Sequence, residues 1–445
     1  MNRNVRHLEQ KGLVLVAVLW VVMLLTTIVT TLGHTSLLDM KVCLVRTEET
    51  RCKWACRAGI ETAIGVLNED LRDSDCLTDL WSDNDTDFND VPLERCYFTV
   101  KVIDEAGKLN INTITRERLM NLEYMTDEIA DAIVDWRDND DTVSRSGAEA
   151  GYYESLPFAY TVRNGPLKTI RELLLVKGVA AELFFGEDTN LNGLLDFNEQ
   201  DGDESPPADD LDDELDEGWI AQLTCYSYDR NVDAAGNTRV NINEADEDRL
   251  TQSLGIKQAV AKWIVEQRPN NGYSSIADVI NENSPEKPAA EETSNRDRGR
   301  DSNEVQAEPL DMQTFYQIAD KITISNQQQI PGRININTAP REVLAALFGD
   351  DDSAEQLAED IIAHRDGLMY GMESIAELLD VESMNLSTFK QIANDITVRS
   401  DVFTIRCVAT ADRGNTTGTT VKTEAVVDRS STPCRILYWH QGASF

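Results

Sequence analysis

Residues 104–119 read DEAGKLNINTITRERL, and the Asn110-Ile111-Asn112 triplet inside this stretch recurs twice further along the chain. The later copies are Asn241-Ile242-Asn243 and Asn335-Ile336-Asn337. Seven residues after the second asparagine, each copy has a leucine: Leu119, Leu250 and Leu344. A pattern that recurs with this spacing indicates an internal repeat. We therefore expect three similar units in the middle of the chain.

Each unit also carries two later signals of helical structure. An isoleucine and an arginine stand four residues apart, on one helix face: Ile133 and Arg137, Ile264 and Arg268, Ile361 and Arg365. Each unit then closes with a capping-box pattern, in which a hydroxyl residue precedes an acidic residue by three: Thr169 and Glu172, Ser275 and Asp278, Ser374 and Glu377. The asparagines are interpreted as turn or helix-entry residues, and the leucines as core.

The three units resemble the helix-hairpin-helix module of ComEA-type DNA-binding proteins. Such a module presents backbone N–H groups to a phosphate from a Gly-x-Gly turn at a helix N-terminus. Here the second unit has Gly255-Ile256-Lys257 and the third has the acidic Gly349-Asp350-Asp351-Asp352. The formal net charge of −38 also repels a phosphate backbone. We expect structure or protein contact from these units and no nucleic acid, and a membrane-anchored DNA receptor is the alternative.

The amino terminus predicts a membrane span. Arg3, Arg6 and Lys11 precede an uncharged apolar run from Leu13 to Leu32. As a helix, these twenty residues cover about 30 Å, which is the thickness of the hydrocarbon core of a bilayer. The positive flank favours a cytoplasmic amino terminus. A cleaved signal peptide is the alternative, but the residues after the apolar run do not form a small-x-small cleavage site.

The boundary Lys11-Gly12-Leu13 resembles a type IV prepilin leader, which its peptidase cuts after the glycine. Gly12 and Leu13 are thus the candidate processing residues, and the apolar segment would be retained. Counted from Leu13, the fifth residue is Ala17, where most pilins have a glutamate. The helix is expected to continue to Asp70, because Cys56, Ile60, Ala63 and Leu67 recur at helical spacing.

A long insertion distinguishes the first unit. It contains Asp135-Trp136-Arg137-Asp138-Asn139-Asp140-Asp141, Gly147-Ala148-Glu149 and Tyr152-Tyr153, and the KTIREL helix follows at 168–173. With the entry at Asp104 and the third unit GRININTAPREVLAAL at 332–347, this combination resembles the K-type (GspK) minor pseudopilins of type II secretion systems. K-type pseudopilins also lack the glutamate that Ala17 replaces. The second unit and two polar linkers exceed the usual plan of that family.

The resemblance implies an α+β fold: an N-terminal transmembrane spine helix packed on a small antiparallel, pilin-like sheet, with a large inserted helical domain. Strand patterns at Cys96–Ile103, Phe403–Ala409, Thr420–Val427 and Arg435–Trp439 agree with one sheet split by the insertion. The expected parts are a leader (1–12), a spine helix (13–75), sheet (76–107), repeat 1 (108–200), an acidic linker (201–218), repeat 2 (219–280), a polar linker (281–310), repeat 3 (311–400) and sheet (401–445).

Two acidic segments predict calcium. Residues 188–199 fit the twelve-residue EF-hand loop, with candidate ligands at Asp188, Asn190, Asn192, Leu194 (through its carbonyl), Asp196 and Glu199. A second site is predicted from Asp138, Asp140 and Glu149, because clustered carboxylates repel unless an ion separates them. The resemblance also implies calcium in this domain. Solvated metal-free loops are the alternative for both segments.

The remaining chemistry of the chain argues against an enzyme. It has four histidines, no nucleophile motif and no phosphate loop, so we expect no catalytic residues. Eight cysteines without paired CxxC spacing suggest disulfides in an oxidising compartment, with Cys76–Cys96 and Cys407–Cys434 as possible local pairs and free thiols as the alternative.

The resemblance implies a single-pass protein of the inner membrane, with its bulk in the periplasm, that is processed by prepilin peptidase. It also implies a cap at the pseudopilus tip, assembled with I-type and J-type minor pseudopilins and other pseudopilus subunits to promote export of folded proteins. A calcium-dependent adhesin is a further alternative.

Overall fold

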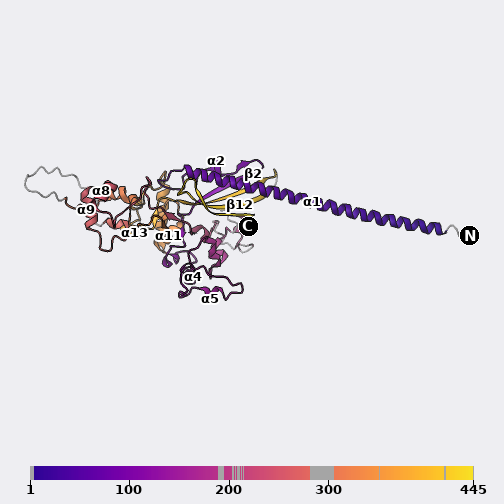
Figure 1. Ribbon diagram of the computed structural model, residues 1–445, viewed down its shortest axis with the longest axis horizontal. Helices are drawn as coiled ribbons and strands as arrows, with labels where there is room; N and C mark the ends of the chain where they lie inside the picture. The colour runs from indigo at the N-terminus through magenta and orange to yellow at the C-terminus, as the bar shows by residue number, and fades with distance from the viewer. Residues whose placement is uncertain are drawn as a thin grey trace, which may run out of the picture.

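The computed structural model describes residues 5–188, 195–202, 205, 207, 211, 213, 215–280, 305–349, 351–414 and 417–443. One helix, α1 (Val5–Glu69), dominates the shape of the molecule. Its 65 residues reach about 98 Å at the usual rise per residue. The N-terminal half of α1 projects alone from a head that holds all the other elements (Figure 1). The sequence prediction of a helix from the apolar run to Asp70 is thus confirmed to within one residue.

The second half of α1 packs against a five-stranded antiparallel sheet. The strand order is β1-β2-β11-β12-β13. The strands are β1 (Val91–Leu93), β2 (Cys96–Asp104), β11 (Val402–Asp412), β12 (Thr417–Asp428) and β13 (Arg435–Ala443). The four strands predicted from sequence lie within β2, β11, β12 and β13. The predicted α+β fold is therefore confirmed, and the short edge strand β1 is an addition to it.

The contact between α1 and the sheet is close and apolar. Cys56, Ile60, Ala63 and Leu67 are fully buried, as their spacing predicted. Gly59 allows the close approach: a Cβ atom there would lie only 2.7 Å from the Cys407 sulfur and 2.9 Å from side-chain carbons of the sheet. Because such contacts are too short for any side chain, glycine is required at this point of the helix.

The helical insertion leaves and re-enters the sheet at a single point. Asp104, the last residue of β2, is the antiparallel partner of Phe403 at the start of β11. The Glu105 N–H then bonds to the Val402 carbonyl at 3.0 Å. The whole segment between these neighbouring strand ends is therefore an insertion into one hairpin connection. Its α-helices beyond four or five residues are α4 (Asp127–Arg137), α8 (Glu247–Leu254), α9 (Gln258–Glu266), α10 (Met312–Ile318), α11 (Arg341–Phe348), α12 (Asp352–Asp366) and α13 (Leu386–Ile392).

Three units in the insertion share one set of hydrogen bonds. The second asparagine of each triplet exchanges two hydrogen bonds with a backbone further on: Asn112 with Leu167 (2.7 and 3.0 Å), Asn243 with Tyr273 (2.7 and 3.0 Å), and Asn337 with Met372 (2.9 Å each). Arg137 and Arg365 each donate to the carbonyl of a triplet isoleucine and to a carbonyl just after the triplet. Arg268, just beyond the end of α9, donates to the Ala245 carbonyl. The three leucines are fully buried, and all three capping boxes are present, on short 3₁₀ helices.

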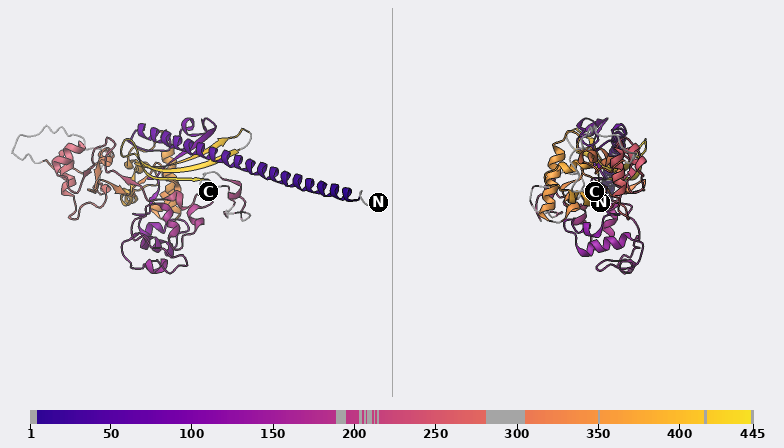
Figure 2. Two further views of the ribbon diagram at one scale, coloured as in Figure 1. Left: turned by 45° about the vertical axis from the view of Figure 1, so that its right-hand side comes forward. Right: turned by 90° about the vertical axis from the view of Figure 1, so that its left-hand side faces the viewer.

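Each unit also closes on itself through a two-residue parallel strand pair. The pairs are β3 (Leu109–Asn110) with β4 (Leu223–Thr224), β6 (Val240–Asn241) with β7 (Ile322–Thr323), and β9 (Ile334–Asn335) with β10 (Ile396–Thr397). From the sequence, we expected residues 219–224 to open the second unit and residues 311–323 to open the third. In the structure, 219–224 instead pair with the first unit and 311–323 with the second. The core of the three units is continuous. The pair α8–α9 lies at the end of the head farthest from the N-terminus. Helices α4 and α5 (Ala150–Tyr153) lie to one side of the head (Figures 1 and 2).

A buried arginine holds the end of α1 to the end of the sheet. Arg429, which directly follows β12, is 1% exposed and donates to Asp70 at 2.7 Å and to Asp75. It also donates to the Ser400 carbonyl at 3.1 Å, and its guanidinium lies over the Phe403 ring. The buried Asp75, the partly buried Asp70 and the buried Arg429 thus compensate one another at the base of the helical insertion.

The cysteines do not form the pairs suggested by local spacing. Cys76 contacts Thr78 and Asp79, and the Cys96 sulfur lies 3.9 Å from that of Cys52. The Cys434 sulfur contacts Asn68. The expected Cys76–Cys96 and Cys407–Cys434 pairs are therefore wrong, because the packing of α1 brings other cysteines to the two strand residues.

Replacement of Arg429 with Met tests the buried charge cluster. We expect the R429M variant of residues 43–445 to lose about 3–5 kcal/mol of stability, because Asp75 stays fully buried without its cation. The thermal melting midpoint measures this loss.

A matched surface substitution serves as the control. Arg341 pairs with exposed glutamates, so R341M should cost less than about 1 kcal/mol. Equal melting midpoints for R429M and R341M would show that the buried cluster contributes no more than a surface ion pair.

Candidate cation site and apolar spine helix

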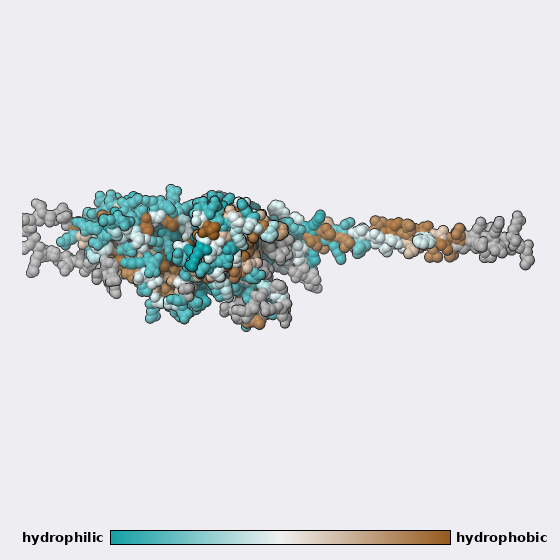
Figure 3. Space-filling view, turned by 90° about the horizontal axis from the view of Figure 1, so that it is seen from below, coloured by the Kyte–Doolittle hydropathy of each residue, from teal (hydrophilic) through white to brown (hydrophobic). Residues whose placement is uncertain are grey.

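The projecting part of α1 carries an uncharged and mostly apolar run from Leu13 to Leu32. From Leu13 onward, its large hydrophobic residues are exposed; Leu13 is 75% exposed and Trp20 67%. Figure 3 shows hydrophobic residues along this part, while the head surface is mostly hydrophilic. By length and composition, this one helix among the described residues could cross a membrane, and a signal sequence would pass the same test. The Gly12–Leu13 boundary lies inside α1, so cleavage there would leave a helix that begins with the apolar run.

Three carboxylates in the first repeat unit form a compact group. Asp135, Asp138 and Glu149 each offer an oxygen, and these oxygens all lie within 4.8 Å of one another. Asp135 lies in the last turn of α4, and Asp138 is the C-cap of the same helix. Glu149 is the N-cap of α5. The acidic loop between the two helices therefore returns Glu149 to the end of α4.

Local contacts fix the shape of this loop. Both Asp135 oxygens accept from the Ser144 N–H, at 3.1 and 3.2 Å. A Cβ on Gly147 would lie 2.0 Å from an Asp135 oxygen, so a glycine is required where the loop passes the carboxylate. The Lys177 ammonium donates to the Ser146 and Gly147 carbonyls at 3.3 and 3.4 Å. The carboxylate group is thus held by the fold around it.

Glu149 marks where a cation would bind. The side chain is 4% exposed, and neither of its oxygens has a hydrogen-bond partner. Burial, together with the neighbouring carboxylates of Asp135 and Asp138, raises the pKa of Glu149 to about 7. Burial also raises the pKa of Asp138. A buried acceptor without a donor is costly, and a cation between the three carboxylates would remove that cost.

The donor set fits calcium better than a transition metal. Calcium takes carboxylate and carbonyl oxygens at 2.3–2.6 Å, and two ligands on opposite sides of the ion are then about 5 Å apart. The three carboxylates fall within this separation, and no nitrogen or sulfur ligand is among them. Bound here, the ion would neutralise the buried charges and join α4 to α5.

Two of the three sequence-predicted residues belong to this group. Asp138 and Glu149 do, whereas Asp140 is exposed and its Oδ1 accepts from the Thr142 N–H at 2.7 Å. Sequence reasoning missed Asp135, although its position three residues before Asp138 places both on the same side of α4. That helical spacing is the signal that could have identified it.

The predicted EF-hand loop is described only at its two ends. Asn190, Asn192 and Leu194 lie outside the described residues. Asp188 and Glu199 are both 1% exposed, and Asp196 and Glu199 cap a 3₁₀ turn, η2 (Phe197–Glu199). Burial raises the pKa of Glu199, and the charges of Asp188 and Asp196 raise it further. The first, ninth and twelfth positions of the loop therefore lie near one another, beside Lys422 of β12.

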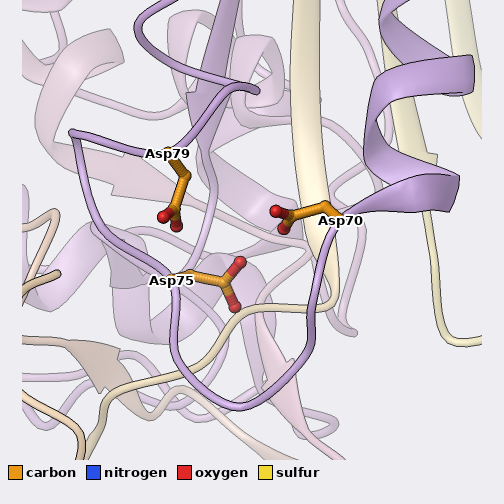
Figure 4. Close-up of side chains that lie close together, drawn as sticks. All are labelled: Asp70, Asp75 and Asp79. Carbon is orange, nitrogen blue, oxygen red and sulfur yellow. The ribbon is translucent and has the colours of Figure 1, made fainter.

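A second carboxylate group has its counter-charge within the protein. Asp70, Asp75 and Asp79 point toward one another from the end of α1 and the loop that follows (Figure 4). Arg429 binds the first two, and Asp79 accepts from the Cys76 N–H at 2.8 Å and from the Trp81 indole at 3.2 Å. Because an arginine already compensates this group, it is a structural cluster and a weaker cation site than the one around Glu149.

The proposed cation site is tested by calcium titration of residues 43–445. E149Q should weaken calcium binding at this site by roughly tenfold or more, because one of three ligand charges is lost. D140N is the matched control, and we expect it to change the affinity by roughly threefold or less. Isothermal titration calorimetry measures both. A larger loss for D140N than for E149Q would reverse the assignment.

Calcium binding at this site should also depend on pH. With a pKa of about 7, Glu149 changes from mostly ionised at pH 8 to mostly protonated at pH 6. Protons then compete with the ion, so the calcium affinity should fall about tenfold over this range. The E149Q variant should lose this dependence. A wild-type affinity that is flat from pH 8 to pH 6 would exclude Glu149 as a ligand.

Comparison with known proteins gives concordant matches. Residues 107–185 and, separately, residues 334–399 match two family models, each described as type II secretion system (T2SS), protein K. A relative, the type II secretion system protein K of Aeromonas hydrophila, is 26% identical over 205 residues. That alignment covers 40% of this chain and 61% of the relative, so the match spans about three fifths of that protein.

A solved structure was also matched, the GspK-GspI-GspJ complex from the type 2 secretion system of enterotoxigenic Escherichia coli. The TM-score is 0.46 at 14% identity, and the match covers 89% of this chain and 98% of the other. The family matches contain the loop around Glu149 and the third asparagine triplet, which carried the resemblance in the sequence. Two segments of the chain thus match the protein K family of type II secretion systems, and together with the relative they support a K-type (GspK) minor pseudopilin.

Proposed function

We propose that this chain caps the tip of a type II secretion pseudopilus and, with I-type and J-type minor pseudopilins, promotes the export of folded proteins. The observation that carries the proposal is the division of α1. Its first part is an exposed apolar helix, and its second part is buried against the sheet of a wide head (Figure 1). The first part is free to pack among other spine helices, while the head remains at one end.

The shape of the head supports a terminal position. The helical insertion extends both to one side of the sheet and beyond it, away from the N-terminus (Figures 1 and 2). In a helical assembly of spine helices, the next subunit would have to place its sheet where these units lie. The insertion therefore blocks addition of a subunit above this one.

Ala17 also supports a position at the top. The glutamate found there in most pilins neutralises the terminal amine of the neighbouring subunit. A topmost subunit has no neighbour above it, so an uncharged residue is tolerated. By this account prepilin peptidase cuts after Gly12, α1 anchors the chain in the inner membrane by a single pass, and the head lies in the periplasm.

Calcium would act as a structural ion in this assembly. The ion would compensate the carboxylates around Glu149 and fix the loop between α4 and α5. Calcium is abundant outside the cytoplasm, so such a site suits a periplasmic head. We assign the ion no catalytic role.

Protein contact fits the repeat units better than DNA binding. In the third unit the N-terminal N–H groups of α12 are already bonded to a carboxylate: Asp351 accepts from Ser353 and Ala354 at 3.1 and 3.0 Å. These N–H groups would have to bind a phosphate in a DNA-binding hairpin. The Asp351 carboxylate both occupies them and repels the phosphate.

Immunogold labelling of assembled pseudopili tests the cap. A tagged full-length chain should label one end of each fibre and leave the shaft unlabelled. A17E alone should keep the label at the end, because the helical insertion still blocks further addition. Label spread along the shaft with the wild-type chain would contradict the proposal.

A second variant separates the steric block from Ala17. Because Asp104 and Phe403 are direct strand partners, a two-residue Asn-Gly turn can replace the intervening segment. We expect this variant, when combined with A17E, to label the shaft. Circular dichroism checks that its sheet has formed. Label still restricted to the end would show that something other than the insertion determines the position.

A further inference from the structure

Two cysteines lie on the face of α1 that packs against the sheet. Cys52 and Cys56 are one helical turn apart, and both are fully buried. Each of them faces a buried cysteine of a different strand: Cys96 begins β2, and Cys407 lies in the middle of β11. The four thiols therefore form two pairs at the joint between the spine helix and the head.

Sulfur positions identify the partners. The Cys52 and Cys96 sulfurs lie 3.9 Å apart. The Cys56 thiol donates to the Cys407 carbonyl at 3.5 Å, and the two thiols are in direct contact, which raises the pKa of Cys407. The Cys407 sulfur also lies against Gly59, one turn further along α1. A disulfide bond is about 2 Å long, so the sulfurs of each contacting pair must move closer together for a bond to form.

A tetrahedral metal site does not explain this arrangement. Four thiolates on zinc at 2.3 Å are all about 3.8 Å from one another. Among the described residues, which include all four cysteines, the groups of three or more close ligands contain only carboxylates. The four cysteines therefore lie in two separate pairs.

We infer that the chain carries two disulfides, Cys52–Cys96 and Cys56–Cys407, which join the spine helix covalently to β2 and β11. This inference rests on the proposed function, because it requires a head in the oxidising periplasm. The two bonds would prevent α1 from sliding along the sheet or separating from it.

Thiol–disulfide exchange accounts for the atoms and electrons. A cysteine thiolate attacks one sulfur of a disulfide-bearing envelope oxidoreductase and releases that enzyme's other sulfur as a thiolate. The partner cysteine, also as a thiolate, then attacks the mixed disulfide and releases the oxidoreductase as a dithiol. Each pair of thiols thus loses two electrons and two protons in total when its bond forms, and both electrons pass to the oxidant.

The first exchange step, with the oxidoreductase, must precede the final docking of α1. Cys52 and Cys56 are inaccessible in the folded head, and burial raises the pKa of Cys52 to about 12. A buried, protonated thiol is a poor nucleophile toward an external disulfide. Once formed, the two bonds are shielded in the same way, and they should resist reductants unless the protein is unfolded.

Peptide mapping of the full-length chain tests the inference. The chain is isolated from membranes of an expressing bacterium, with free thiols blocked by N-ethylmaleimide at lysis. Trypsin cuts after Lys53, between Cys52 and Cys56, so the two linkages give separate peptides. Mass spectrometry without reduction should find Cys52 linked to Cys96 and Cys56 linked to Cys407. Other linkages, or four alkylated thiols, would overturn the inference.

A control for location separates the two proposals. Protease added to spheroplasts should digest the head if it lies in the periplasm. Alkylated Cys52 and Cys96 in a protease-accessible head would overturn the disulfides and leave the proposed function intact. A protected head would overturn the periplasmic location itself, and with it the basis of the disulfides.

Paired variants measure the effect on stability. C52S/C96S should lower the melting midpoint of the oxidised full-length chain by roughly 5–10 °C relative to the same chain with C225S, whose cysteine belongs to neither pair. Reduction of the unfolded wild-type chain, followed by refolding under reducing conditions, should lower the midpoint at least as far, because it breaks both bonds. Equal midpoints for oxidised and reduced wild-type chains would contradict a stabilising bond.

Discussion

The architecture depends on one buried polar cluster where the helical insertion meets the sheet. The Asp104 carboxylate accepts from the Asn335 amide at 2.9 Å, the Thr338 hydroxyl at 2.6 Å and the Ser400 hydroxyl at 2.5 Å. The same Asn335 amide donates to the Asp75 carbonyl at 3.1 Å. The loop after α1, the end of β2 and both ends of the third repeat unit are thus held together. Because Asp104 is buried, an unpaired partner here would be costly, and only one arrangement satisfies all of these groups.

This cluster connects the repeats to the proposed role of the head. The first asparagine of the third unit, Asn335, contributes its amide to the cluster, while the second, Asn337, closes the unit internally. In the first unit Asn110 instead binds Ser227, outside its own unit. The repeats therefore share an internal framework and differ in what their first asparagine contacts. The first asparagines of the first and third units thus join similar units to different parts of the head.

Local patterns in the sequence predicted local structure well, and the packing between distant segments less so. Helical spacing identified the buried face at Ile60 and Leu67, and the capping patterns lie where they were expected. Asp135 was missed as a site residue, because its carboxylate meets Glu149 only when the acidic loop folds back on α4. The cysteine pairs were predicted wrongly for the same reason. Cys56 and Cys407 are 351 residues apart, and only the docking of α1 on the sheet brings them together.

Native mass spectrometry of the full-length chain, co-expressed with its neighbouring I-type and J-type pseudopilins in detergent, tests the central claim most directly. A cap has one surface for partners and a blocked opposite end. The account therefore predicts a complex with one copy of this chain and one of each partner, and no larger species that contains two copies. Complexes with two or more copies of this chain, or a chain that binds neither partner, would contradict a cap.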